Sequence, residues 1–144
     1  MVRVIMHGCN GRMGQVITEM IAKEAEMEIV AGVDVSDSVH NTYPVFKTLK
    51  DCDVEADVVI DFANAKAVDG LLDVCVERNL PCVLCTTGLS EEQLAHVKEA
   101  SGKVAILRSA NMSMGINLLM KLLKDAVPVC LLYTSPSPRD LSTS

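Results

Sequence analysis

The stretch that decides the fold is HGCNGRMG, His7 to Gly14, in which three glycines stand three residues apart. It follows a short apolar run, VRVIM at 2–6, and it opens a segment at 11–26 with helical spacing of apolar residues. Where a strand turns into a helix, the first amides of the helix point outward without partners. Those amides and the helix dipole attract a phosphate. The stretch therefore predicts a phosphate-binding turn.

The three glycines suit a diphosphate in different ways. Glycine in such a turn lets a diphosphate approach the backbone, and a glycine at the third position lets helix and strand pack closely. Gly8, Gly11 and Gly14 can fill these roles. The spacing is G-x-x-G-x-x-G and not the commoner G-x-G-x-x-G, so the motif alone leaves a tight turn without a ligand as the alternative.

An acidic residue, Asp34, ends the next apolar run, EIVAGVD at 28–34. An acid about 20 residues after such a loop accepts hydrogen bonds from the adenine ribose of a dinucleotide. Val35 follows, where a basic residue would have favoured a 2′-phosphate, so we expect NADH in preference to NADPH. Arg12 could stack on adenine or reach a phosphate, which leaves use of both open. The alternative for Asp34 is a solvated loop acid.

Apolar runs alternate with helical patterns along the chain, which predicts an α/β fold with a Rossmann-type doubly wound parallel sheet. Strands are expected at 2–6, 28–34, 56–62, 81–86 and 103–109, and helices at 11–26, 65–79, 90–101 and 114–127. The first helix places on one face Met13, Val16, Ile17, Met20 and Ile21. The polar region 35–55 is expected to hold one short helix near FKTLKDC.

Two further loops follow expected strands at their carboxyl ends, where an open parallel sheet binds ligands. They are CTTG, Cys85 to Gly88, and SANMS, Ser109 to Ser113. Their backbone and small polar groups suit a carboxamide and a ribose. Ordinary helix capping is the alternative, although Ser90 already forms a capping box with Gln93 in the first case.

The composition fits one domain whose core is built from aliphatic residues and methionine, because 49% of the 144 residues are hydrophobic and only 3% are aromatic. The net charge of −6 argues against nucleic acid or an anionic membrane as a partner. No apolar run approaches the roughly 20 residues of a membrane span. The sequence also lacks the pattern of a signal peptide. We therefore expect a cytoplasmic protein.

Neither a metal site nor disulfide bonds are expected from the six cysteines, most of which stand in apolar segments. Cys82 and Cys85 form C-x-x-C, but three residues apart in a strand they point to opposite faces. The histidines form no catalytic or metal-spaced set, so His7 is expected to pack or cap at a strand end, and Asp61 to cap or orient a loop.

Four segments in order, GCNGRMG, VVIDFANAKAV, CTTGLSEEQ and SANMSMGINLLMKLL, resemble the 4-hydroxy-tetrahydrodipicolinate reductase (dihydrodipicolinate reductase) family of lysine and diaminopimelate biosynthesis. The resemblance runs from Val2 to about Val129 and implies a domain that binds NADH or NADPH. It also implies a small-molecule substrate and, for the full-length protein, a homo-oligomer. The cofactor-binding residues that it implies are Gly8, Cys9, Asn10, Gly11, Arg12, Met13, Asp34, Cys85, Thr86, Thr87, Ser109, Ala110, Asn111 and Met112. Cys85 stands where the family's Gly-Thr-Thr loop has glycine, so a side chain must be housed there.

The family's substrate domain is absent from this sequence, because neither its His-His-x-x-x-Lys stretch nor its Ala-Pro-Ser-Gly-Thr-type loop is found. By the resemblance that domain supplies the general acid, so no catalytic residue is assigned. We expect a dinucleotide-binding domain at 1–129 and a non-native or disordered tail at 130–144, which is rich in Ser, Thr and Pro. The chain alone is expected to bind a dinucleotide weakly and to turn over nothing.

Two alternatives remain open on the sequence alone. One is a non-catalytic dinucleotide-binding or redox-sensing Rossmann module, for which residues 130–144 would be a genuine tail. The other is a small Rossmann dehydrogenase such as a sugar oxidoreductase. The latter needs a lysine-bearing motif after SANMS, and MSMGIN does not supply one.

Overall fold

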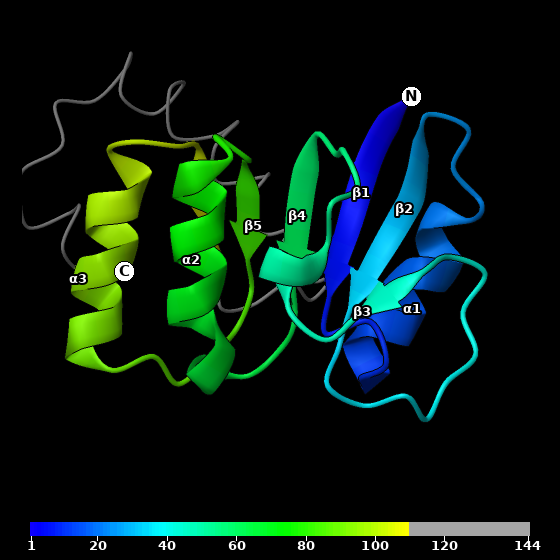
Figure 1. Cartoon of the computed structure of the whole chain (residues 1–144), viewed down its shortest axis with the longest axis horizontal. Helices are drawn as coiled ribbons and strands as arrows, with labels where there is room; N and C mark the ends of the chain where they lie inside the picture. The colour runs from blue at the N-terminus through cyan, green and yellow to red at the C-terminus, as the bar shows by residue number, and fades with distance from the viewer. Residues whose placement is uncertain (110–144) are drawn as a thin grey trace, which may run out of the picture. The chain divides into compact units, whose positions relative to one another are not determined.

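The structure, a computed structural model, describes residues 1–109 of the chain (Figure 1). Its described part contains one sheet of six strands in the order β3-β2-β1-β4-β5-β6, and every neighbouring pair is parallel. The strands are β1 (Val2–His7), β2 (Met27–Val33), β3 (Val45–Phe46), β4 (Val58–Asp61), β5 (Cys82–Leu84) and β6 (Ile106–Arg108). The expected Rossmann-type sheet is thus confirmed.

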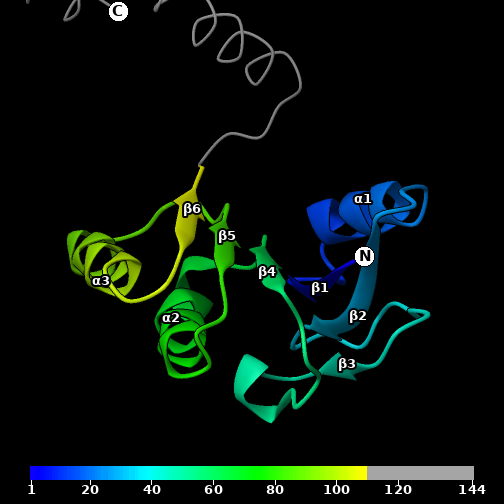
Figure 2. The same cartoon turned by 90° about the horizontal axis from the view of Figure 1, so that it is seen from above.

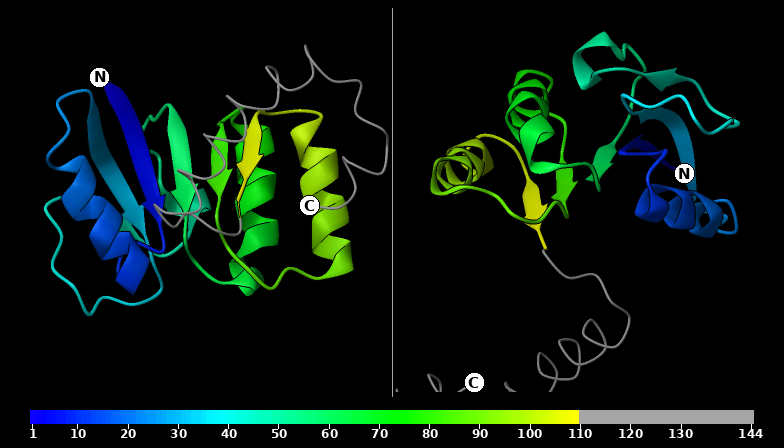
Figure 3. Two further views of the ribbon diagram at one scale, coloured as in Figure 1. Left: turned by 180° about the vertical axis from the view of Figure 1, so that it is seen from behind. Right: turned by 90° about the horizontal axis from the view of Figure 1, so that it is seen from below.

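Helices cover both faces of this sheet. They are α1 (Arg12–Ile21), α2 (Val68–Glu77) and α3 (Glu91–Ser101), with single 3-10 turns η1 (Leu49–Asp51) and η2 (Ala65–Ala67). Seen from above, α1 lies on one face, and α2 and α3 lie on the other (Figure 2); the views from behind and below agree (Figure 3). Coverage on both sides explains why the strands read as nearly continuous apolar runs.

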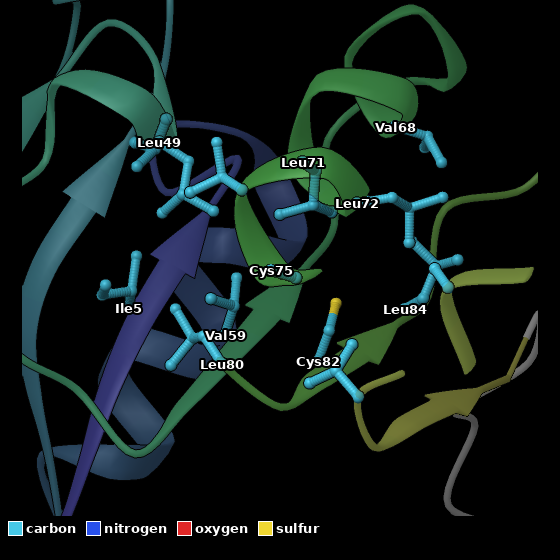
Figure 4. Packing of buried hydrophobic residues seen from close by; sticks show 14 of the residues in the cluster. Ile5, Leu49, Val59, Val68, Leu71, Leu72, Cys75, Leu80, Cys82 and Leu84 are labelled. Carbon is cyan, nitrogen blue, oxygen red and sulfur yellow. The ribbon is translucent and has the colours of Figure 1, made fainter. Parts of the chain in front are cut away.

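The largest part of the core lies between α2 and the strands (Figure 4). Leu71 and Leu72 of α2 are buried against Ile5, Val59 and Leu84 of the sheet. Aliphatic side chains fill this layer, as the low aromatic content predicts. Burying each of them stabilises the fold by about 1.5–3 kcal/mol. The core therefore fixes the strands whose carboxyl ends form the candidate site.

The buried face of α1 differs from the one that the spacing predicted. Gly14 and Ile21 are buried, whereas Met13, Val16 and Met20 are 42%, 44% and 59% exposed. A Cβ added to Gly14 would collide with the carbonyl oxygen of Gly8 and would lie 2.8 Å from backbone atoms of Cys9. Because α1 approaches the loop closely at this glycine, the side of the helix with Gly14 and Ile21 packs inward. The side with Met13 and Met20 faces solvent.

The region 35–55 contains the expected short helix as η1, and it also contains the edge strand β3, which the sequence did not predict. Two residues are too few to show alternation, and the pairing depends on contacts with β2. The expected helix at 114–127 and the tail at 130–144 lie outside the described residues. Among residues 1–109, no helix is long and apolar enough to span a membrane.

Candidate functional site

The loop between β1 and α1 is shaped by Gly8, which has a φ of +81°. Its amide donates a hydrogen bond of 2.7 Å to the carbonyl of Val33, so the loop is tied to the end of β2. A Cβ at this position would lie 2.8 Å from backbone atoms of Phe62 and Ala63. Both the positive φ and the close approach require glycine for the fold itself.

The other two glycines of the loop differ from each other. Gly14 cannot carry a Cβ, because helix and loop backbone are already in contact there. At Gly11 an added Cβ would meet only the carbonyl oxygen of Gly8, at 3.4 Å, which is an ordinary contact. Gly11 lines a hollow at the carboxyl edge of the sheet. Intramolecular packing therefore does not require a glycine here, and the position leaves room for a ligand to approach the backbone closely.

The N-terminus of α1 is open to an anion. Gly11 is its N-cap residue, no side chain caps it, and its first turn contains no acidic residue. The amides of the first helical turn, from Arg12 to Gly14, therefore face outward together with the positive end of the helix dipole. Arg12 is exposed beside them. This arrangement fits a diphosphate.

Asp34 lies directly after β2 and is joined to the glycine loop. Its Oδ2 accepts a hydrogen bond of 2.9 Å from the amide of Asn10, and its Oδ1 accepts one of 2.9 Å from the amide of Ser36. Each carboxylate oxygen keeps capacity for another donor, such as a sugar hydroxyl. The structure thus brings together two parts of the site that are separated along the sequence by a helix and a strand.

Two adjoining hollows open beside this pair. The first, of about 250 Å³, is lined by His7, Gly8, Gly11, Val33, Asp34, Val35, Lys47, Phe62, Ala63, Asn64 and Ala67. The second, of about 470 Å³, shares His7, Val35, Lys47 and Ala67 with the first, and Leu49, Leu71 and Val74 contribute apolar walls. Neither Lys47 nor the segment 62–67, part of the family-like stretch VVIDFANAKAV, is assigned to the site from the sequence, because only the fold brings them beside Asp34.

Cys85, Thr86 and Thr87 follow β5 at the same edge. Cys85 is only 5% exposed, so its side chain is housed in the interior, and Thr87 is exposed. Burial is the main reason that the pKa of the Cys85 thiol is raised to about 11, and the charge of the nearby Asp61 adds to the effect. The pKa of the Cys9 thiol is also raised to about 11, mainly by burial and in addition by the charge of Asp34. Both thiols are therefore protonated near neutral pH and are poor nucleophiles.

His7 and Asp61, which were expected to have only local roles, lie in contact at the ends of β1 and β4. The His7 Nδ1 and the Asp61 Oδ1 are 2.5 Å apart. Thr86 donates a hydrogen bond of 2.5 Å to the Asp61 Oδ2. All three residues are buried. The network links the end of β1 with the loop after β5.

The second predicted loop is described only at its start. The amide of Ser109 donates a hydrogen bond of 2.9 Å to the carbonyl of Leu84, which places Ser109 beside the end of β5. Ala110, Asn111 and Met112 lie outside the described residues. Among residues 1–109, His, Cys, Asp and Glu form no group of three that could hold a metal ion, and the five cysteines described there are free and buried.

Comparison with known proteins assigns the family. Residues 2–112 match the family model described as dihydrodipicolinate reductase, N-terminus. The chain belongs to this family. Several relatives are named 4-hydroxy-tetrahydrodipicolinate reductase. One, from Caldanaerobacter subterraneus subsp. tengcongensis, is 48% identical over 90% of this chain and 51% of that protein. Another, from Clostridium tetani, is 46% identical over 87% of this chain and 49% of that protein. The chain spans about half the length of the curated relatives it matches.

One solved structure supports the family assignment, and another shares the fold. The dipicolinate-bound dihydrodipicolinate reductase from Paenisporosarcina sp. TG-14 superposes with a TM-score of 0.73 and 27% identity, over 88% of this chain and 53% of that one. The WlbA dehydrogenase from Bordetella pertussis, in complex with NADH and UDP-GlcNAcA, has a TM-score of 0.69 over 90% of this chain and 40% of that one. Its identity of 15% shows a shared fold alone.

Proposed function

We propose that the carboxyl edge of this sheet binds a nicotinamide dinucleotide. The diphosphate lies on the amides at the start of α1, and the adenine ribose hydroxyls bind Asp34. The single observation that carries the proposal is the uncapped N-terminus of α1 with Asp34 hydrogen-bonded to the loop that precedes it. The adenine ring lies in the apolar hollow walled by Leu49 and Leu71.

The nicotinamide lies at the other half of the edge, beside the two loops that follow β5 and β6. In this proposal the loop 85–87 contacts the carboxamide, and residues 109–112 contact the nicotinamide ribose. The buried side chain of Cys85 leaves the loop backbone free for close approach, as the family's glycine would. The remaining contacts of the glycine loop come from Cys9, Asn10 and Met13.

We further propose that the whole protein is an NAD(P)H-dependent 4-hydroxy-tetrahydrodipicolinate reductase that forms tetrahydrodipicolinate in lysine and diaminopimelate biosynthesis. Family membership and the relatives of that name support this activity. When bound, the cofactor supplies the hydride, and the residues of this chain hold and orient it. The proposal takes residues 1–129 as the dinucleotide-binding domain, with a homo-oligomeric, cytoplasmic full-length protein.

NADH is the preferred cofactor in this proposal, because the Asp34 carboxylate repels a 2′-phosphate and Val35 offers it no charge. Lys47 lies on the same hollow, and its Nζ donates a hydrogen bond of 2.9 Å to the carbonyl of Val35. This ammonium group partly offsets the repulsion. NADPH is therefore expected to bind more weakly than NADH without being excluded.

Titration of the purified chain with NADH and with NADPH, followed by nucleotide fluorescence, tests the proposal. Asp34→Ala should weaken NADH binding by about 1–3 kcal/mol, as when a hydrogen bond to a charged group is lost. NADPH should lose less affinity, because the same change also removes the repulsion of its 2′-phosphate. Asp37→Ala, in the same loop and exposed, is the matched control and should leave both affinities unchanged. Equal NADH affinity of Asp34→Ala and the parent would remove Asp34 from the site.

A further inference from the structure

A buried polar network of His7, Asp61 and Thr86 lies between the two halves of the proposed site, and the contacts proposed above use neither His7 nor Asp61. Asp61 is fully buried, while His7 and Thr86 are 6% and 5% exposed. They come from the end of β4, the end of β1 and the loop after β5. These three strands are neighbours in the sheet.

Asp61 is the acceptor at the centre of this network. Its Oδ1 is 2.5 Å from the His7 Nδ1 and accepts a hydrogen bond of 3.2 Å from the amide of Ala63. Its Oδ2 accepts a hydrogen bond of 2.5 Å from the Thr86 hydroxyl. An ionised carboxylate can only accept, so it requires a proton on Nδ1 and directs the hydroxyl hydrogen of Thr86. Asp61 thereby fixes the orientation of both side chains.

The other imidazole nitrogen of His7, Nε2, is not fully buried, and His7 lines the ligand hollow. Within residues 1–109, every fully buried side-chain nitrogen or oxygen has a hydrogen-bond partner. The His7 hydrogen bond runs through Nδ1, and His7 lines both hollows. Nε2 is therefore the polar atom that His7 presents at the hollow surface.

The network also crosses the point where a ligand is expected. His7 and Asp61 are in register across the β1–β4 pair, and the strand order reverses between these strands. In open parallel sheets the ligand crosses the edge at this reversal. Burying a carboxylate costs free energy unless its hydrogen bonds are satisfied, and an apolar side chain at this position would pack against the sheet without that cost. Structural cohesion alone does not account for Asp61.

We propose that Asp61 is a positioning residue of the dinucleotide site, which holds Thr86 and its loop in the orientation that receives the nicotinamide. Through the same carboxylate it holds His7 with Nε2 toward the hollow. This inference rests on the proposed binding of a nicotinamide dinucleotide. It adds that the nicotinamide end is held by a side chain that has no contact with the ligand.

Comparing NADH with ADP-ribose isolates the nicotinamide end, because ADP-ribose has the diphosphate and both riboses but lacks the nicotinamide ring. Calorimetric titrations of the chain would use Thr86→Val, Thr86→Ser and Asp61→Asn. In Asp61→Asn the amide oxygen still accepts from His7 and Ala63, but the amide nitrogen cannot accept from Thr86. Thr42→Val, an exposed threonine outside both hollows, is the control.

We expect Thr86→Val and Asp61→Asn to raise the Kd for NADH about tenfold, the effect of one net hydrogen bond. Thr86→Ser keeps the hydroxyl and should recover the parent affinity, and Thr42→Val should leave it unchanged. All variants should bind ADP-ribose with the parent Kd, which also verifies that they are folded. If Asp61→Asn fails this check, the contrast between Thr86→Val and Thr86→Ser carries the test.

Three results would overturn the positioning role. An unchanged Kd for NADH in folded Asp61→Asn, with weakened binding in Thr86→Val, would mean that Thr86 contacts the ligand without help from Asp61. Equal weakening of NADH and ADP-ribose would mean that the network only supports the fold. If neither Thr86→Val nor Asp61→Asn changed the Kd for NADH, the network would play no part. Failure of the parent chain to bind either ligand would instead contradict the proposed function itself.

Discussion

Gly11 and Gly14 are equivalent in the sequence motif, yet the structure gives them different roles. A side chain at Gly14 would collide with the backbone of Gly8 and Cys9, whereas Gly11 has ordinary room. Gly11 serves a ligand in our account and Gly14 serves the fold. A motif read along the chain shows where backbone must come close, but not whether the close neighbour is protein or ligand.

Gly11→Val should weaken NADH binding by more than the roughly 1–3 kcal/mol expected for Asp34→Ala, because its side chain blocks the diphosphate. Stability should fall by only about 1 kcal/mol, the usual scale for an N-cap change. Gly14→Ala is the counterpart: overpacking against backbone should lower the free energy of unfolding by about 1–3 kcal/mol or more. Fluorescence titration and thermal unfolding of both variants check this, and unaltered NADH affinity in Gly11→Val would contradict it.

At the scale of elements, a signal that lies within one helical turn predicts the structure, whereas features that depend on tertiary contacts cannot be predicted from the local sequence. The capping box of Ser90 and Gln93 was predicted because both halves of the signal lie within one turn, and the structure contains both hydrogen bonds. The buried side of α1 depends on the close approach at Gly14, and β3 depends on pairing with β2. Neither of these tertiary contacts produces a periodic pattern of apolar residues in the sequence.

The contact between α2 and α3 includes pH-dependent ion pairs. The His96 Nδ1 on α3 lies 2.7 Å from Asp69 Oδ1 on α2, and its Nε2 lies 3.2 Å from Asp73 Oδ1. The hydrogen bond to Asp69, with the charge of Asp73, raises the pKa of His96 above its ordinary 6.5. The stabilisation is therefore complete below that ordinary value and is lost as the pH rises through the raised pKa of the folded state.

His96→Gln should accordingly lower the free energy of unfolding by up to about 1 kcal/mol near pH 5.5, the upper range for exposed ion pairs. At about pH 9 the variant and the parent should be equally stable, since the imidazole is then neutral in both states. Denaturant unfolding at the two pH values measures the difference. His40→Gln, at an exposed histidine, serves as the control, and a pH-independent effect of His96→Gln would argue against the ion pairs.

At the scale of the whole molecule, the alternation of elements was enough to predict a parallel sheet wound on both faces, and thus the edge where the site lies. It was also enough to pair Asp34 with the glycine loop. It could not reveal the His7–Asp61 contact, because that contact joins residues 54 positions apart through strand register. The place of Lys47 beside Asp34 likewise depends on the fold. A residue whose role depends on the order of the strands can be recognised only when the fold is known.

The central claim is that the amides opening α1 hold a diphosphate while Asp34 holds the neighbouring ribose. A crystal structure of the chain with saturating NADH tests it most directly. We predict diphosphate oxygens about 3 Å from the amide nitrogens of the first turn of α1, and ribose hydroxyls hydrogen-bonded to Asp34. A dinucleotide bound elsewhere, or this edge of the sheet closed by the chain's own side chains, would contradict the account.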